Sequence, residues 1–274
     1  MTSVVGVAVR EAGPTFNPFD PSQVDDQVAT LARLRRESPV TELLPGVFYL
    51  AKHGDILDVC RAPQTFRQGR FLPLDQDTRT PDELNLGETD PPQHTGVRKV
   101  LVHLTKDVIV GGTETTTHLI GNLFVNVCGT PGAYGRLRDD RTLVPKAVEE
   151  TLRISGPVQI LFRVPESDVT IGGAAIPAGA TVALGYASAN RDEEVFEDPD
   201  AFSLDRGEDV RKLHLGFGFG VHLCVGAALA RLEAVSALNA TLDRIPHMAL
   251  APGFEYRRVR FFMMRGPTRV DVVF

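Results

Sequence analysis

The stretch FGFGVHLCVG, residues 217–226, is the most informative part of the chain, and an Ala/Leu-rich segment predicted as a long helix follows it. This order places the thiol of Cys224 at the mouth of a helix N-terminus. Unpaired backbone N–H groups and the positive end of the helix dipole stabilise a thiolate there. The glycines let the backbone approach a flat cofactor and point amides at the sulfur. A thiolate held in this way suits an iron that must cleave an O–O bond.

Three other interpretations of this stretch deserve comparison. One is a buried structural cysteine that follows a glycine turn. Another is a dinucleotide-binding loop, because glycines alternate from position 216 to position 220, but they follow no convincing strand and the pattern ends on a cysteine. A zinc site built from Cys224, His222 and His214 lacks a second nearby cysteine and any closely spaced pair of ligands.

The run 217–226 resembles the haem-ligand signature of cytochromes P450 at every restricted position, and three further motifs appear in that family's order. The resemblance implies a mainly α fold with small β sheets and haem b (iron protoporphyrin IX) as the cofactor. It also implies that Cys224 binds the iron, with Phe217 and Gly226 in the same haem-binding loop.

The sequence ETLR, residues 150–153, is similar to the family's E-x-x-R motif. The i,i+3 spacing sets Glu150 and Arg153 on one helix face, where a desolvated pair can fix the haem-supporting core. By itself such a pair is usually a surface ion pair. In the family a downstream arginine completes the network, but Ala201 stands where that arginine often lies, which leaves Arg191 and Arg206 as alternatives.

The run GGTET, residues 111–115, resembles the oxygen-binding groove of the family's long central helix. Glycines weaken helical hydrogen bonding and leave space for dioxygen. The resemblance implies that Thr115 supplies a hydrogen bond during oxygen activation and that Glu114 relays protons from solvent. The alternative is a helix whose threonines bond back to the carbonyl four residues earlier.

Four residues resemble the family's haem-propionate ligands: His94, Arg98, Arg163 and His222. His94 stands where many family members have tryptophan, and this chain has no tryptophan. Two carboxylates on one cofactor need several cationic or N–H donors. His214 either joins this set or is a loop histidine.

Hydrophobic periodicity and turn residues predict the remaining organisation. Helices are expected over residues 23–37, 53–62, 93–104, 107–128, 143–155 and 225–245, the fourth interrupted by the GGTETTT run. A β-hairpin is expected over 39–52, strands and turns over 158–183, and a terminal hairpin over 256–274 around Gly266-Pro267. No linker divides the chain, so a single domain over residues 1–274 is expected.

The resemblance breaks near residues 104–107. Residues 1–104 resemble the family's N-terminal part, and residues 108–274 resemble the part from the oxygen-groove helix onward. Between these parts, family members carry several helices that roof the substrate pocket, so the resemblance implies an internally truncated fold. A lid normally excludes water and positions the substrate, so its loss weakens the coupling of oxygen activation to hydroxylation.

Composition limits the class of protein further. The chain has 274 residues, 43% of them hydrophobic, and a formal net charge of −6, which argues against a nucleic-acid partner attracted by bulk charge. Its three cysteines are too few and too scattered for a disulfide framework. The N-terminus has no basic start followed by a long apolar run, and no stretch is long enough for a membrane span. We therefore expect a soluble, cytoplasmic protein.

The resemblance implies a monooxygenase that inserts one oxygen atom from dioxygen into an apolar small molecule. The electrons would come from a ferredoxin or flavodoxin with its reductase, because the chain has no flavin domain. The alternative is a truncated haem-binding remnant or sensor without efficient monooxygenase activity, and a third interpretation is a haem-free structural protein. The substrate stays open, because the segments that select it in the family are the missing ones.

Overall fold

The computed structural model describes residues 16–17, 27–69, 89–91, 94, 105–207 and 209–274, with the backbone alone for 105–110. The α-helices are α1 (Val28–Glu37), α2 (His53–Arg61), α4 (Thr105–Gly129), α5 (Ala133–Asp139), α6 (Val144–Ser155), α7 (Tyr186–Ala189), α8 (Val210–Leu213) and α9 (Ala227–Arg244). Short 3-10 turns are η4 (Arg141–Leu143) and η5 (Gly220–His222). The strands are β1 (Val40–Leu44), β2 (Val47–Leu50), β3 (Phe66–Gln68), β4 (Ile160–Pro165), β5 (Val169–Ile171), β6 (Ala174–Ile176), β7 (Thr181–Gly185), β8 (Ala249–Leu250) and β9 (Val272–Val273).

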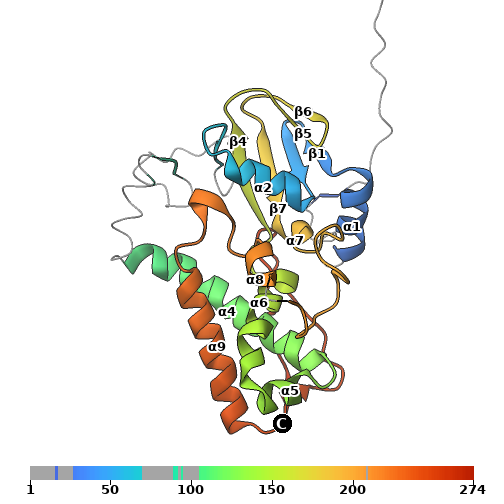
Figure 1. Ribbon diagram of the computed structural model, residues 1–274, viewed down its shortest axis with the longest axis vertical. Coiled ribbons are helices and arrows are strands. Elements are labelled where there is room, and N and C mark those ends of the chain that lie inside the picture. Colours follow the sequence, from blue (N-terminus) through green and yellow to red (C-terminus); the bar gives the residue numbers. More distant parts are fainter. Residues whose placement is uncertain (1–15, 18–26, 70–88, 92–93, 95–104, 208) are drawn as a thin grey trace, which may run out of the picture.

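The main sheet has the strand order β1-β2-β7-β4-β3, with β2 and β7 parallel and the other pairs antiparallel. Its central strands bury Leu50, Phe162 and Val182. The aromatic Phe162 and the β-branched Val182 are of the kinds that pack well on a pleated surface. β5 pairs with β6 and β8 with β9 in two small separate sheets. In Figure 1 the main sheet forms one layer, and the long helices lie together beyond it.

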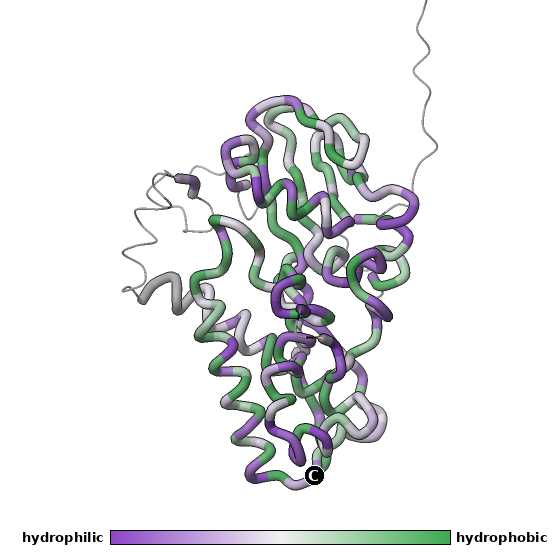
Figure 2. Tube along the Cα trace, viewed as in Figure 1, coloured by the Kyte–Doolittle hydropathy of each residue, from purple (hydrophilic) through white to green (hydrophobic). Residues whose placement is uncertain are grey.

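The helical layer is built around α6, which packs against both α4 and α9. Val144, Val148 and Leu152 recur every four residues on α6 and are fully or almost fully buried. They meet Leu123 of α4 and Leu238 of α9 in one apolar cluster. Figure 2 shows hydrophobic residues along the sheet strands and α4, while α1 is largely hydrophilic.

The mainly helical fold with small sheets that the sequence predicts is confirmed. The first hairpin is confirmed by β1 and β2, and helices lie where periodicity places them at 53–62, 143–155 and 225–245. The helix predicted over 93–104 lies outside the described residues, apart from His94. The single domain over residues 1–274 stays a prediction. The internal truncation was expected near residues 104–107, and the described residues resume there, at Thr105, the first residue of α4.

Two expectations are wrong in detail. The GGTETTT run does not interrupt α4, which is continuous from Thr105 to Gly129. The terminal hairpin is also shorter than predicted: Arg258 and Pro267 form one bridge, and Val272–Val273 then pairs with β8. Pro267 has no N–H to donate, so the ladder cannot extend through it.

The described part of the chain contains no helix that is both long enough and apolar enough to cross a bilayer.

The junction after α6 is closely packed, which generates the first prediction. A Cβ at Gly156 would lie 2.5 Å from the backbone carbonyl oxygen of Leu152, which cannot rotate away. We expect Gly156→Ala to lower the free energy of unfolding by about 1–3 kcal/mol through overpacking. Gly135→Ala is the matched control, because Gly135 lies within α5 and a Cβ there meets nothing within 4 Å. Urea unfolding of both variants checks this, and equal destabilisation would contradict it.

Candidate functional site

The loop that carries Cys224 lies between α8 and α9 and depends on two left-handed glycines. Gly218 and Gly220 have φ values of 71° and 75°, a region that side chains with a Cβ rarely adopt. A Cβ at Gly220 would also lie 2.6 Å from the carbonyl oxygen of Cys60. The Cys224 N–H donates to the Phe217 carbonyl at 2.9 Å and closes the loop. α9 begins at Ala227, so Cys224 lies three residues before its first turn.

The three cysteines, all within the described part, form no disulfide and lie in different environments. Cys60 is buried, and burial raises the pKa of its thiol. Burial also raises the pKa of Cys128 to about 11. Both of these thiols stay protonated near neutral pH, which suits neither a metal ligand nor a nucleophile. Cys224 is the exposed one, so the buried-cysteine interpretation does not hold for it.

The residues that precede the loop decide between the other interpretations. They form the short helix α8 rather than a strand, which removes the dinucleotide-loop alternative. Both ring nitrogens of His214 are engaged, one with Glu149 at 2.8 Å and one with the Gly216 N–H at 3.1 Å. A zinc site that includes His214 is therefore incompatible with its contacts.

A buried carboxylate on α6 organises the neighbouring segment. The side chain of Glu150 is 2% exposed and accepts from Arg153 Nε at 2.8 Å and Nη2 at 2.8 Å. Arg206 Nε reaches the same carboxylate at 2.8 Å, and the Ser203 N–H reaches it at 3.2 Å. Arg206 therefore completes the network. Arg191 instead pairs with Asp200 and the Ile154 carbonyl.

Sequence reasoning missed a second carboxylate on the same helix. Glu149 accepts from His214 and from Arg231 of α9, with Arg231 Nε at 2.6 Å. Burial alone would raise the pKa of Glu149, but the hydrogen bonds from His214 and Arg231 outweigh it and lower the pKa to about 2. The signal was the pair of adjacent glutamates at 149–150, only one of which belongs to the E-x-x-R motif.

Two of the predicted propionate ligands come together beside Cys224. The rings of His94 and His222 lie 4.5 Å apart between centroids, although they are far apart in sequence. Arg163 is buried on β4 and donates to the Phe162 carbonyl at 2.8 Å. Arg98 lies outside the described residues.

In the predicted oxygen groove, the threonines are hydrogen-bonded to the carbonyls four residues earlier, which was the alternative interpretation of this run. The Thr115 hydroxyl donates to the Gly111 carbonyl at 2.5 Å, which is the i−4 back-bond of a helical threonine. Glu114 is exposed, and its carboxylate lies 3.6 Å from Nε2 of His118.

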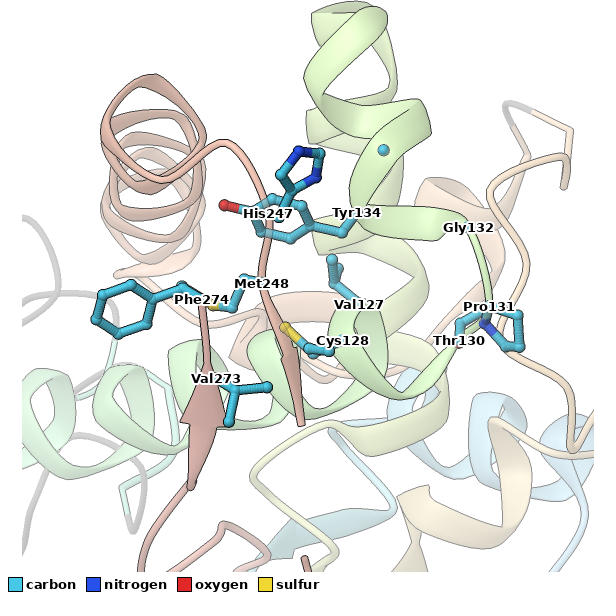
Figure 3. A pocket seen from close by; sticks show the side chains of 12 residues that line it. Val127, Cys128, Thr130, Pro131, Gly132, Tyr134, His247, Met248, Val273 and Phe274 are labelled. Atoms are coloured by element: carbon cyan, nitrogen blue, oxygen red, sulfur yellow. The ribbon is translucent and has the colours of Figure 1, made fainter. Parts of the chain in front are cut away.

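A cavity of about 570 Å³ lies away from this region (Figure 3). It is lined by the C-terminal end of α4, by α5 and by β8 and β9, with Cys128, Tyr134 and Met248 among its walls. α9 separates it from the Cys224 loop, and a helix of 18 residues is roughly 27 Å long. The cavity is therefore not part of the candidate site.

A family model described as cytochrome P450 matches residues 92–246, more than half of the chain. The chain belongs to the cytochrome P450 family. The family's cofactor is haem b, bound through a cysteine thiolate.

Curated relatives support this assignment over part of their length. Cytochrome P450 107B1 of Saccharopolyspora erythraea is 43% identical over 167 residues, which are 60% of this chain and 40% of the relative. The cytochrome P450 monooxygenase PikC of Streptomyces venezuelae is 43% identical over 156 residues, 56% of this chain and 37% of the relative. The chain thus spans about two fifths of the length of the curated relatives that it matches.

Solved structures show the same fold. The substrate-free cytochrome P450 CYP150A6 of Mycobacterium marinum matches with a TM-score of 0.83 at 22% identity, over 94% of this chain and 98% of that one. Cytochrome P450 CYP109Q5 of Chondromyces apiculatus matches with a TM-score of 0.83 at 24% identity, over 93% and 97%.

The residues around Cys224 suit a flat, mostly apolar group that carries carboxylates. Val221, Leu223 and Val225 flank the thiol and are 43–44% exposed, an apolar surface of the kind that a porphyrin face covers. Both ring nitrogens of His222 are buried without a hydrogen bond, although its Nε2 lies 3.7 Å from Asp90. Buried polar atoms of this kind call for a partner, and a propionate oxygen would supply one.

Arg206 has four acceptors: Glu150 and the backbone carbonyls of Glu197, Asp198 and Ala201. We expect Arg206→Ala to lower the free energy of unfolding by about 3–5 kcal/mol, because it leaves a buried carboxylate with one partner fewer. Arg136→Ala breaks an exposed pair with Asp205 and should change stability little. Urea unfolding of the two variants checks this, and a small effect of Arg206→Ala would show that Arg153 alone balances Glu150.

The lowered pKa of Glu149 generates a pH prediction. A carboxylate whose folded-state pKa lies below its unfolded value stabilises the fold above the unfolded pKa and loses that effect as the pH falls. For Glu149 this window runs from about 4.5 down to about 2. We expect the difference in unfolding free energy between the natural protein and Glu149→Gln to be constant above about pH 5 and to shrink below it. A difference that does not change with pH would contradict this assignment.

Proposed function

We propose that the chain is a haem-thiolate monooxygenase that inserts one oxygen atom from dioxygen into an apolar small molecule. The observation that carries the proposal is the position of Cys224, an exposed thiol on a two-glycine loop just before α9. The named monooxygenase PikC is among the relatives and supports it. When bound, haem supplies the activation of dioxygen.

The chain's own residues have separate parts in this proposal. Cys224 holds the iron as a thiolate, close to the N–H groups at the start of α9. His94, Arg98, Arg163 and His222 hold the propionates as hydrogen-bond donors. Phe217 and Gly226 shape the loop.

Proton delivery falls to the exposed part of α4 in this proposal. The Glu114 carboxylate is 63% exposed, so it can exchange protons with solvent and pass them toward the haem. The Thr115 hydroxyl must turn away from the Gly111 carbonyl to offer its proton, a rotation about one side-chain bond.

The electron donor that we propose is a ferredoxin or flavodoxin with its reductase, in the bacterial cytoplasm. Family membership and the bacterial relatives support a separate donor. The substrate is an apolar small molecule.

A second candidate, a haem-binding remnant or sensor without efficient monooxygenation, is favoured by the groove. Gly111, Thr113 and Glu114 are exposed, and a wet groove releases reduced oxygen as peroxide instead of transferring it. The ratio of hydroxylated product to hydrogen peroxide, measured with a surrogate redox partner, separates the two. Peroxide with no product above the Cys224→Ala background would replace the first candidate by the second.

The primary test is the carbon monoxide difference spectrum of the reduced, haem-loaded protein. We expect a strongly red-shifted Soret band, because a thiolate pushes electron density onto the iron. Cys224→Ala should abolish the band, while Cys128→Ser, which changes a half-buried thiol at the C-terminal end of α4, should keep it. A band at the position of histidine-ligated haem would overturn thiolate ligation by Cys224, and the absence of haem uptake would leave a haem-free protein.

A further inference from the structure

Glu149 is bonded to both flanks of the Cys224 loop. On the N-terminal flank, His214 directs Nε2 to the Glu149 carboxylate at 2.8 Å. On the C-terminal flank, Arg231 donates Nε at 2.6 Å and Nη2 at 3.0 Å. Since α6 packs against both α8 and α9, one carboxylate on α6 ties the two ends of the loop to the same support.

Two lines of contact continue from these ends toward the thiol. The Arg231 guanidinium lies over the ring of Phe217, 4.6 Å from its centroid, and the Phe217 carbonyl accepts the Cys224 N–H at 2.9 Å. On the other flank, His214 accepts the Gly216 N–H at 3.1 Å, next to Phe217. Both lines end at the backbone that closes the loop.

The charges and protons of Glu149, His214 and Arg231 explain why the Glu149 carboxylate is needed to hold this cluster together. The Glu149 side chain is 13% exposed and the His214 side chain 2%. His214 accepts from Gly216 through Nδ1, so a neutral ring carries its proton on Nε2 and donates it to Glu149. The negative charge of Glu149 is balanced by Arg231. Removal of the carboxylate leaves the buried His214 and the half-buried Arg231 without their acceptor, and an unsatisfied buried donor costs more than the bond itself contributes.

We propose that Glu149 is a positioning residue for Cys224, acting through Arg231 and Phe217 on one side and through His214 on the other. The proposal deepens the function proposed above and rests on Cys224 as the thiolate ligand. It differs from a merely structural role, because it assigns Glu149 an effect on the Cys224 loop that exceeds its effect on the rest of the chain.

The first experiment is amide hydrogen exchange of the purified full chain, resolved by peptide. In Glu149→Gln we expect exchange in residues 215–226 to rise on the order of tenfold, with the main sheet unchanged. The matched control is Glu193→Gln, which weakens a similar bond to the buried Arg35, at 2.8 Å, on an element away from the loop. The control should leave residues 215–226 unchanged.

The second measurement is the fraction of haem-loaded protein that gives the thiolate-type carbon monoxide band. Glu149→Gln should lower this fraction severalfold, and Glu149→Asp, which keeps the charge, should restore part of it. Arg231→Lys keeps a charge for Glu149 but loses the planar group over Phe217, so it should resemble Glu149→Gln. If Glu149→Gln does not fold, Arg231→Lys and His214→Gln carry the same comparison.

The proposal is overturned if exchange in residues 215–226 rises no more than in the main sheet, or if Glu193→Gln has the same effect. It is also overturned if the thiolate-type fraction is the same in all variants. Failure of the natural protein to take up haem would refute the proposed function instead, and the exchange comparison would still decide whether Glu149 holds the loop.

Discussion

Two adjacent carboxylates on α6 hold the parts of the molecule that the site depends on. Glu150 binds Arg153 and Arg206, and Arg206 in turn binds three carbonyls of the segment 197–201. Glu149 binds His214 and Arg231 on either side of the Cys224 loop. A buried carboxylate is tolerated only with partners that replace water, so each glutamate dictates where its partners must lie. The chain between α7 and α9, in which the short elements α8 and η5 are separated by irregular segments, is thereby held in place.

The α6 sequence shows why this arrangement works. Val144, Val148 and Leu152 bury one face against α4 and α9, and this burial orients the helix before any charge is paired. Glu149 and Glu150 then lie about 100° apart around the helix axis, as successive residues do. They therefore point to different neighbours. Apolar packing fixes the orientation of α6, and the ion pairs of Glu149 and Glu150 then fix the Cys224 loop and the segment 197–201.

The sequence predicts the parts of this structure whose signals are local. The helices α1, α2, α4, α6 and α9 were expected from the sequence, whereas the short helices α5, α7 and α8 were not. The Cys224 loop follows from its glycines and the helix behind it. Arg206 was one of two alternatives, because the choice depends on the path of the 52 residues between Arg153 and Arg206. The contacts that join Glu149 to His214 and Arg231 could not be predicted, since the three residues come from parts of the chain that meet only in the folded protein. The shortened terminal hairpin was missed because the donor lost at Pro267 outweighs the alternation around it.

The proposed chemistry has a thiol side around Cys224 and an oxygen side on α4, and different interactions hold these two sides in place. The thiol side is held by buried ion pairs, by left-handed glycines and by a backbone hydrogen bond, all between described residues. The oxygen side consists of exposed residues of α4 whose Thr115 hydroxyl is engaged with its own helix. On α9, Leu229 and Leu232 are 45% and 62% exposed, so apolar surface near the loop is also uncovered. In the proposed function, haem binding and oxygen transfer are therefore separable properties, because the first depends mainly on the thiol side and the second depends on what covers the groove.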